Sequence, residues 1–427
     1  MTTQALTELS VSQAARAIAE GKLTSRDLVG ACLERIQARE ETVGAWEFLD
    51  QSLALAQAAE RDNAPRKGPL HGVPVGIKDI IQTADMPTGY GSPIYPNNRT
   101  GIDAECVKRL RAAGAVIMGK TVTTEFAVFF PGKTTNPHNR LHTPGGSSSG
   151  SAAAVADYQV PFALGTQTAG SVIRPASFCG VIGYKPSYAL IPIDGVLPCA
   201  ISLDTVGIFA RHIDDLPLIA GVLAGISLKE PDSIKLVPPR IAMLRTPWWD
   251  KAEPDKQKAL ESTAQALARA DAPMSELDIP EFEDVRDAHL KIMYREIAAS
   301  RRTEYENHRN LLSPKLLEII ESGRALKISD VQSAVRVARR WQNKIAHLFD
   351  AHDVILAPSA PGSAPEGISA TGDPIFNAVW TLLGVPCITY PVARSSKGLP
   401  IGVQVIGPVD GDERLIAAAK WMQQNSA

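Results

Sequence analysis

The spacing of hydrophobic and polar positions divides the chain into segments that predict different secondary structure. Up to about residue 60 the pattern predicts helices. Between about 70 and 225, short apolar runs are separated by glycine and proline, and segments with a helical pattern lie between them. The runs that predict buried strands are GVPVGIKDI (72–80), AVIMGK (115–120) and VPFALGTQT (160–168), and those that predict helices are DAECVKRLRAAG (103–114) and SGSAAAVADY (149–158). Strands that alternate with helices predict an α/β sheet with largely parallel pairing.

The second half of the chain predicts a helical region and then a return of strands. Residues 230–350 are more charged and mostly helical in pattern, and the apolar residues of 329–350 fall on one helical face. Strand-like runs return within 351–427, at DVILAPSA (353–360), PCITYPV (386–392) and IGVQVIGP (401–408). We expect one domain over residues 1–427, with a central mixed, largely parallel sheet flanked by helices.

Composition and charge narrow the class of protein. A formal net charge of −2 provides no basic surface for nucleic acid and no polybasic membrane anchor. The five cysteines are scattered without a C-x-x-C pair, which favours free thiols in a reducing compartment over disulfides or a zinc site. No signal peptide is visible, and the apolar run at 218–228 is shorter than the ~20 residues that a spanning helix needs. We expect a cytoplasmic protein that binds neither nucleic acid nor membrane.

A glycine- and serine-rich segment, TPGGSSSGSAAAVA at 143–156, admits four interpretations. A flexible linker is one, but the segment is short and lies between strand-like runs. A nucleophile elbow is another, because GSSSG fits G-x-S-x-G with Ser148 at its centre; that motif needs a preceding strand, and a proline-interrupted loop stands there instead. The remaining two are a phosphate-binding loop and a backbone scaffold that holds one serine for chemistry.

Nucleotide binding is a distant alternative that rests mainly on GAVIMGKT (114–121). This stretch matches the phosphate-loop pattern G-x-x-x-x-G-K-[ST] at every position. The mechanism requires the four middle residues to form a loop between a strand and a helix. Here they are Ala, Val, Ile and Met, which predict the strand itself, and a helix precedes them.

Two further features point to hydrolytic chemistry. Lys78 lies in an apolar strand, where it must either pair with an acid such as Asp79 or give up its proton. The segment 165–171 ends in small residues that let backbone N–H groups point into one space, as an oxyanion hole requires. An ordinary glycine turn is the structural alternative for this segment.

Together these segments resemble the amidase signature family. The resemblance rests on GVPVGIKDI, AVIMGKTVTTEFA, PGGSSSGSAAAVA and ALGTQTAGSVIRPASFCGVIGYKPS. It is strong over residues 60–225 and looser over 350–425, and it says little about the charged helical region between them, where such proteins vary.

The resemblance implies a catalytic centre and its residues. Ser171 would be the nucleophile, Ser147 the bridging serine on a cis peptide, and Lys78 the base. Backbone N–H groups near Thr168, Ala169 and Gly170 would hold the oxyanion. No metal and no organic cofactor is expected.

The chain departs from the common family pattern beside the nucleophile. Arg174 stands three residues after Ser171, whereas the arginine is usually two residues after the nucleophile. This variant resembles the malonamidase-like branch, in which that arginine binds a substrate carboxylate, and a structural salt bridge is the alternative. Further candidates for contact with substrate, or else for plain packing or a crowded backbone, are Gly146, Phe126, Phe129 and Tyr95.

The resemblance implies hydrolysis of C–N bonds in small linear amides, extending to carbamates, ureides or esters. The alternative within the family is the glutaminase component of a tRNA-dependent amidotransferase, which works in a complex and passes ammonia to a partner. The expected partner is a small-molecule amide, and family analogy favours a homodimer.

Overall fold

The computed structural model describes residues 2–234 and 238–426. Within them one sheet of eleven strands forms the centre of an α/β domain, in the order β1-β3-β2-β4-β6-β5-β10-β11-β9-β7-β8. The strands are β1 (Trp46–Leu49), β2 (Pro74–Lys78), β3 (Val116–Thr121), β4 (Phe162–Gln167), β5 (Ile182–Lys185), β6 (Thr205–Ala210), β7 (Ile241–Leu244), β8 (Met274–Leu277), β9 (Val354–Pro358), β10 (Cys387–Arg394) and β11 (Pro400–Ile406). The predicted single α/β domain with a mixed sheet is confirmed.

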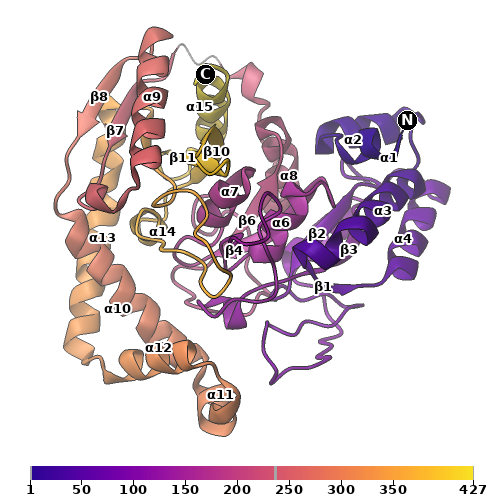
Figure 1. Ribbon diagram of the computed structural model, residues 1–427, viewed down its shortest axis with the longest axis horizontal. Helices are drawn as coiled ribbons and strands as arrows, with labels where there is room; N and C mark the ends of the chain where they lie inside the picture. Colours follow the sequence, from indigo (N-terminus) through magenta and orange to yellow (C-terminus); the bar gives the residue numbers. More distant parts are fainter. Residues whose placement is uncertain (1, 235–237, 427) are drawn as a thin grey trace.

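Helices flank this sheet, and a group of them projects beyond one side of it (Figure 1). They are α1 (Thr3–Thr7), α2 (Val11–Ala19), α3 (Ser25–Val43), α4 (Gln51–Asn63), α5 (Glu105–Ala112), α6 (Ser149–Ala156), α7 (Ile173–Cys179), α8 (Leu216–Ala224), α9 (Pro254–Arg269), α10 (Phe282–Ser300), α11 (Arg302–Asn307), α12 (Pro314–Ala325), α13 (Ile328–Ala351), α14 (Ala378–Leu382) and α15 (Asp412–Gln424). Figure 1 shows α1–α4 beside β1–β3, and the orange helices α10–α13 below β7 and β8 at the opposite side.

The strand pairing is less parallel than the sequence predicts. β2 pairs in parallel with β3 and β4, as expected from the intervening helices α5 and α6. Most of the other pairings among the described strands are antiparallel, including β4 with β6 and β10 with β11. Antiparallel neighbours need no crossover helix, and β10 and β11 are joined by the short connection 395–399. The expectation of largely parallel pairing is therefore wrong, because the sequence pattern does not reveal which strands become neighbours.

Three strands lie in regions where the sequence pattern predicts helices. β1 interrupts the N-terminal helices, and β7 and β8 lie inside the region 230–350. Each has only four residues, which is too short for its periodicity to be distinguished from that of a helix. β8 is also an edge strand with exposed Ser275 and Glu276, so it lacks the apolar run of a central strand.

The predicted amphipathic helix at 329–350 is confirmed as α13. Trp341 and Ile345 on its inner face are buried. Phe282 of α10 packs edge to face against Trp341, with ring centroids 5.2 Å apart, and against Trp380 of α14 at 5.3 Å. These contacts attach the helical region to the rest of the domain.

The GAVIMGKT stretch forms strand rather than a phosphate-binding loop. Residues 116–121 are β3, and Lys120 is fully buried, with its Nζ donating to Ile81 O at 2.7 Å and to Thr88 Oγ1 at 2.6 Å. Without a loop and an exposed lysine, the motif lacks the structure that phosphate binding needs.

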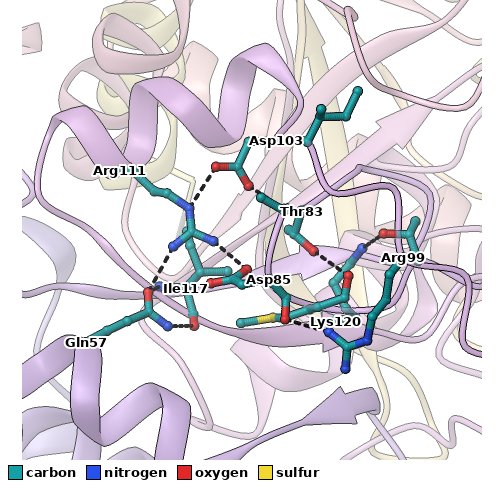
Figure 2. A network of polar contacts seen from close by, with 12 residues as sticks. Gln57, Thr83, Asp85, Arg99, Asp103, Arg111, Ile117 and Lys120 are labelled. Atoms are coloured by element: carbon teal, nitrogen blue, oxygen red, sulfur yellow. Dashed lines mark hydrogen bonds and ion pairs between the residues drawn. The ribbon is translucent and has the colours of Figure 1, made fainter.

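A neighbouring polar network ties the connection 81–103 to α4 and α5. Figure 2 shows Arg111 of α5 bonded to Asp85 (2.6 Å), Asp103 (3.0 Å) and Gln57 of α4 (3.2 Å). Its charges are paired within the fold, which is the arrangement of a structural network.

Of the helices in the described part of the chain, none combines the length and the apolar character needed to cross a bilayer.

Candidate active site

Lys78 is the last residue of β2, and its amine is completely buried. Its Nζ lies 2.7 Å from Ser147 Oγ and 2.8 Å from Thr166 Oγ1. Burial lowers the pKa of Lys78 to about 7, because a charged ammonium is poorly solvated there. Asp79 instead faces Lys120, with 3.5 Å between Oδ1 and Nζ. The alternative of a surface pair between Lys78 and Asp79 is therefore wrong.

The glycine- and serine-rich segment is a buried scaffold around Ser147. The peptide bond between Gly146 and Ser147 is cis, as the family resemblance implies. A Cβ on Gly146 would lie 2.7 Å from Thr371 Cγ2, and one on Gly150 would lie 2.2 Å from the carbonyl oxygen of Ala45. Side chains at these positions would collide with their neighbours, so the glycines serve close packing and not linker flexibility.

Ser171 follows β4 and directly precedes α7. It keeps 8% of its surface exposed, whereas Lys78 and Ser147 are at 0% and 1%. Ser148 Oγ lies 3.2 Å from both N and O of Thr166, which joins the serine segment to β4. Among the hydrogen bonds within the described residues, those donated by Lys78 Nζ reach Ser147 and Thr166, and none joins Ser147 to Ser171.

The loop before Ser171 has its carbonyl groups engaged by surrounding elements. Thr168 O accepts from His289 Nε2 at 2.9 Å, Ala169 O accepts from Thr381 Oγ1 at 2.8 Å, and Gly170 O accepts from Arg174 N at 3.0 Å. Within the described part of the chain, the backbone N–H groups of 168–171 donate no hydrogen bond outside the regular elements. This arrangement leaves N–H groups available on one loop beside Ser171, which is what oxyanion binding requires.

Arg174 lies in the first turn of α7 and is 1% exposed. Its Nη2 donates to Gly146 O at 2.8 Å, and its Nε donates to Thr371 O at 2.8 Å. Burial lowers its pKa to about 10, so it remains charged near neutral pH. In the described residues Arg174 forms no salt bridge, and its Nη1 has no partner. The side chain thus connects the cis peptide to the segment around Thr371.

The aromatic residues that the sequence offers as candidates for substrate contact differ in their packing. Phe126 is buried, and Tyr95 meets it edge to face with ring centroids 6.1 Å apart. The Tyr95 hydroxyl donates to Glu304 Oε1 at 2.9 Å. Phe129 is half-buried against the main hydrophobic core. The structure therefore brings Tyr95 and Phe126 into one cluster.

Comparisons with known proteins identify the family of the chain. A family model described as Amidase matches residues 27–416. The chain belongs to the amidase family. One of the subunits of glutamyl-tRNA(Gln) amidotransferase from Agathobacter rectalis is 32% identical, over 97% of this chain and 93% of the relative. A crystal structure of an amidase is 28% identical with a TM-score of 0.89, over 98% of this chain and 100% of the other. The native peptide amidase of Stenotrophomonas maltophilia is 29% identical with a TM-score of 0.83, over 98% and 97%.

The sequence interpretation did not name several residues that surround this candidate site. Gln167 Oε1 accepts from the N–H groups of Val172 (2.9 Å) and Ile173 (3.0 Å) and so orients the start of α7. Asp204 Oδ1 accepts from Thr168 Oγ1 at 2.5 Å, and burial raises the pKa of Asp204 to about 6. No local sequence pattern indicates that Gln167 or Asp204 makes these contacts.

His289 and Thr166 are two further contacts of the centre. His289 is fully buried, and burial lowers its pKa to about 4, so it is neutral and donates through Nε2–H. A signal for His289 does exist, because it shares the apolar face of α10 with Val285 and Ile292. Thr166, the second partner of Lys78, lies in a strand that shows only burial.

Proposed function

We propose that this protein hydrolyses amide C–N bonds through an acyl-enzyme on Ser171, with Ser147 and Lys78 as the proton relay. The observation that carries the proposal is the 2.7 Å contact between Ser147 and a buried lysine whose pKa is about 7. A base is most effective when its pKa lies near the working pH. An ordinary lysine, at 10.5, would be almost fully protonated near neutrality.

The reaction follows from these three side chains. Neutral Lys78 takes a proton from Ser147, Ser147 takes one from Ser171, and Ser171 Oγ attacks the amide carbon. The N–H groups of Thr168, Ala169 and Gly170 stabilise the negative oxygen of the tetrahedral intermediate. The relay then returns the proton to the leaving amine, and water releases the acyl group from Ser171.

The first candidate substrate class is small linear amides, with carbamates, ureides and esters as related acyl compounds. The solved amidase at 28% identity and the peptide amidase at 29% support this class. In this interpretation the isolated chain is sufficient for turnover.

A second candidate is the glutaminase component of an amidotransferase, which acts on glutamine within a larger enzyme. Sequence relatives named as subunits of glutamyl-tRNA(Gln) amidotransferase favour it over the first candidate, since they share 28–33% identity along nearly the whole chain. Their name describes one component of an assembly, so a partner protein would be needed for full activity. Both candidates use the same chemistry at Ser171.

The test is a hydrolysis panel of aliphatic, aryl and acidic amides, carbamates and glutamine, run on wild type and on Ser171→Ala. We expect Ser171→Ala to abolish turnover and labelling by a fluorophosphonate probe. In the wild-type protein, peptide mass spectrometry should map the probe to Ser171. Ser275→Ala, on the exposed edge strand β8, is the matched control and should behave as wild type.

The outcomes separate the candidates. Turnover of simple amides by the isolated chain supports the first, and turnover of glutamine that depends on an added partner supports the second. Labelling of Ser148 or another serine, or full activity of Ser171→Ala, would refute the proposed chemistry.

A further inference from the structure

Helices α10, α11 and α12, which lie next to one another in Figure 1, line a surface cavity of about 450 Å³. Ala298 and Ala299 of α10 are among its lining residues, and their small side chains leave room for a ligand. Beside the cavity α12 packs closely on α10 at Gly323, where a Cβ would collide with the carbonyl oxygen of Tyr294. The cavity is therefore formed by elements whose spacing is set by backbone packing.

Three arginines line this cavity, one from each helix: Arg295 of α10, Arg302 of α11 and Arg324 of α12. The lining also includes one acid, Glu306, whose Oε1 lies 2.9 Å from Arg302 Nε. Among the ion pairs and side-chain hydrogen bonds of the described residues, none involves Arg295 or Arg324. Three guanidinium groups and one carboxylate give the lining a formal charge of +2, in a chain whose net charge is −2.

The residues next to Arg324 orient its side chain without neutralising it. Its guanidinium lies over the ring of Tyr305, 4.8 Å from the centroid, and Arg309 lies over the same ring at 4.6 Å. Glu321 of α12 forms an ion pair with Arg309, so the charge of this carboxylate is already matched. Stacking on an aromatic ring leaves the N–H groups at the edge of a guanidinium available for a ligand.

The acid next to Arg295 in the sequence is also engaged elsewhere. Glu296 accepts from Ser202 N at 3.0 Å and from Ser202 Oγ at 2.5 Å, and it does not line the cavity. Arg295 and Arg324 thus present two unmatched positive charges to the same space.

The charge, the donors and the size of the cavity together select a ligand. Guanidinium groups bind phosphate and carboxylate oxygens through parallel N–H···O bonds. A phosphate monoester carries a charge of about −1.5 to −2 near neutral pH and three strong acceptor oxygens, which match the charge and the donors of this lining. A phosphate diester or a simple carboxylate has one negative charge and would leave the second one on the lining unmatched. The cavity volume lies within the range of small-molecule sites.

We propose that Arg295, Arg302 and Arg324 form a binding site for the dianionic phosphate group of a small phosphate monoester. Arg295 and Arg324 donate to its oxygens from α10 and α12, and Arg302, oriented by Glu306, supplies further donors from α11. Lys78, Ser147 and Ser171 do not line this cavity, so the inference is independent of the proposed function.

The test is a calorimetric titration of the full chain at about pH 8 and about 0.15 M salt, where both phosphates below are dianions and long-range attraction is screened. Glycerol 3-phosphate and inorganic phosphate are compared with the monoanions dimethyl phosphate and acetate. We expect one site per chain, with a Kd of about 1 mM or tighter for the dianions and at least about tenfold weaker binding of the monoanions. Tighter binding of glycerol 3-phosphate than of inorganic phosphate supports recognition of the ester, and equal binding supports recognition of the phosphate group alone.

Variants then connect binding to the cavity. Arg295→Gln and Arg324→Gln should each weaken binding about tenfold, because each removes one charge-assisted contact. Glu306→Gln should instead tighten binding, because it removes the negative charge of the lining and releases Arg302. Arg339→Gln, exposed on α13 and outside the lining, is the matched control and should bind as wild type.

Thermal unfolding checks that the variants, all at exposed positions, keep the fold. Four results would each overturn the site: no binding of either dianion, binding of dimethyl phosphate as tight as that of glycerol 3-phosphate, an equal loss in the control variant, or weaker binding in Glu306→Gln.

Discussion

At the scale of single residues, side-chain contacts distinguish the proposed base, Lys78, better than burial does. Lys78, Lys120 and Lys256 are all fully buried, and burial lowers their pKa values to about 7, 8 and 7. Lys120 donates to Ile81 and Thr88, and Lys256 donates to Ser359. Only Lys78 among these three touches the serine of the cis peptide. A perturbed pKa becomes a functional indication only when the geometry agrees.

Replacing Lys78 by alanine should remove nearly all turnover, because no other base contacts Ser147 in the described structure. We expect kcat to fall at least about a thousandfold, in line with loss of a general base that activates the nucleophile. Initial rates and circular dichroism should show an inactive but folded protein, with exposed Lys108→Ala as the control. A variant that keeps a tenth of wild-type kcat would remove Lys78 from the mechanism.

The pH dependence of catalysis should report the same amine. Lys78 acts in its neutral form, and its pKa is about 7, so kcat/KM should rise as the pH increases from 6 to 8 and level off above that. Thr166→Val removes one hydrogen-bond partner of Nζ and should move this midpoint. A profile that is flat across this range would contradict the assignment.

Activity on acidic and neutral amides can distinguish a structural role of Arg174 from a role in binding a substrate carboxylate. Its contacts with Gly146 and Thr371 predict that Arg174→Met lowers activity on acidic and neutral amides by a similar factor. A carboxylate anchor predicts that only acidic amides suffer. The ratio of kcat/KM for the two substrate classes, measured in wild type and variant, separates these roles.

At the scale of elements, the helical region between β7 and β9 contacts the loop before Ser171, the proposed nucleophile. α10 supplies His289, whose Nε2 contacts Thr168 O in that loop, and Arg301 follows its last turn. If the proposed function holds, this region bears on catalysis although the family resemblance says little about it.

His289 should act as a positioning residue for the Thr168 carbonyl. His289→Leu removes the donor, and we expect kcat to fall about tenfold with little change in KM, because the loop that holds the developing charge loses its support. Partial recovery in His289→Gln, which keeps a side-chain N–H, would distinguish positioning from general packing. His347→Leu, exposed on α13, is the control.

At the scale of the whole molecule, the buried bases link folding to pH. The unfolded chain holds a proton on each lysine up to about pH 10.5, while buried Lys256 in the folded state loses it near pH 7. Unfolding therefore takes up protons, and stability rises with pH in this interval.

We expect Lys256→Met to flatten that rise. The free energy of unfolding, measured in urea at pH 7.5 and 8.5, should lose up to about 1.4 kcal/mol per pH unit of slope relative to wild type. Lys258→Met changes an exposed lysine two residues along the same helix and should leave the slope unchanged. An unaltered slope in Lys256→Met would show that Lys256 stays protonated in the folded protein.

The sequence predicted those features that local pattern encodes. The strands around 74–78, 116–121 and 162–167 and the helix at 328–351 appear as expected, because each is long or apolar enough to show its period. The short strands β7 and β8 do not have that signal, and neither does the pairing of β4 with β6. Pairing depends on which strands meet in space.

The sequence by itself determined the family, because its motifs are written in consecutive residues. Through that resemblance it also predicted the three residues proposed here for catalysis, Lys78, Ser147 and Ser171. Only the tertiary structure decided that Lys78 meets Ser147, 69 positions away, and that His289 supports Thr168 from 121 positions away. It also decided that Arg174 is engaged with Gly146 and Thr371. Such contacts arise from packing across the sheet, and sequence periodicity carries no information about distances between elements that are remote along the chain.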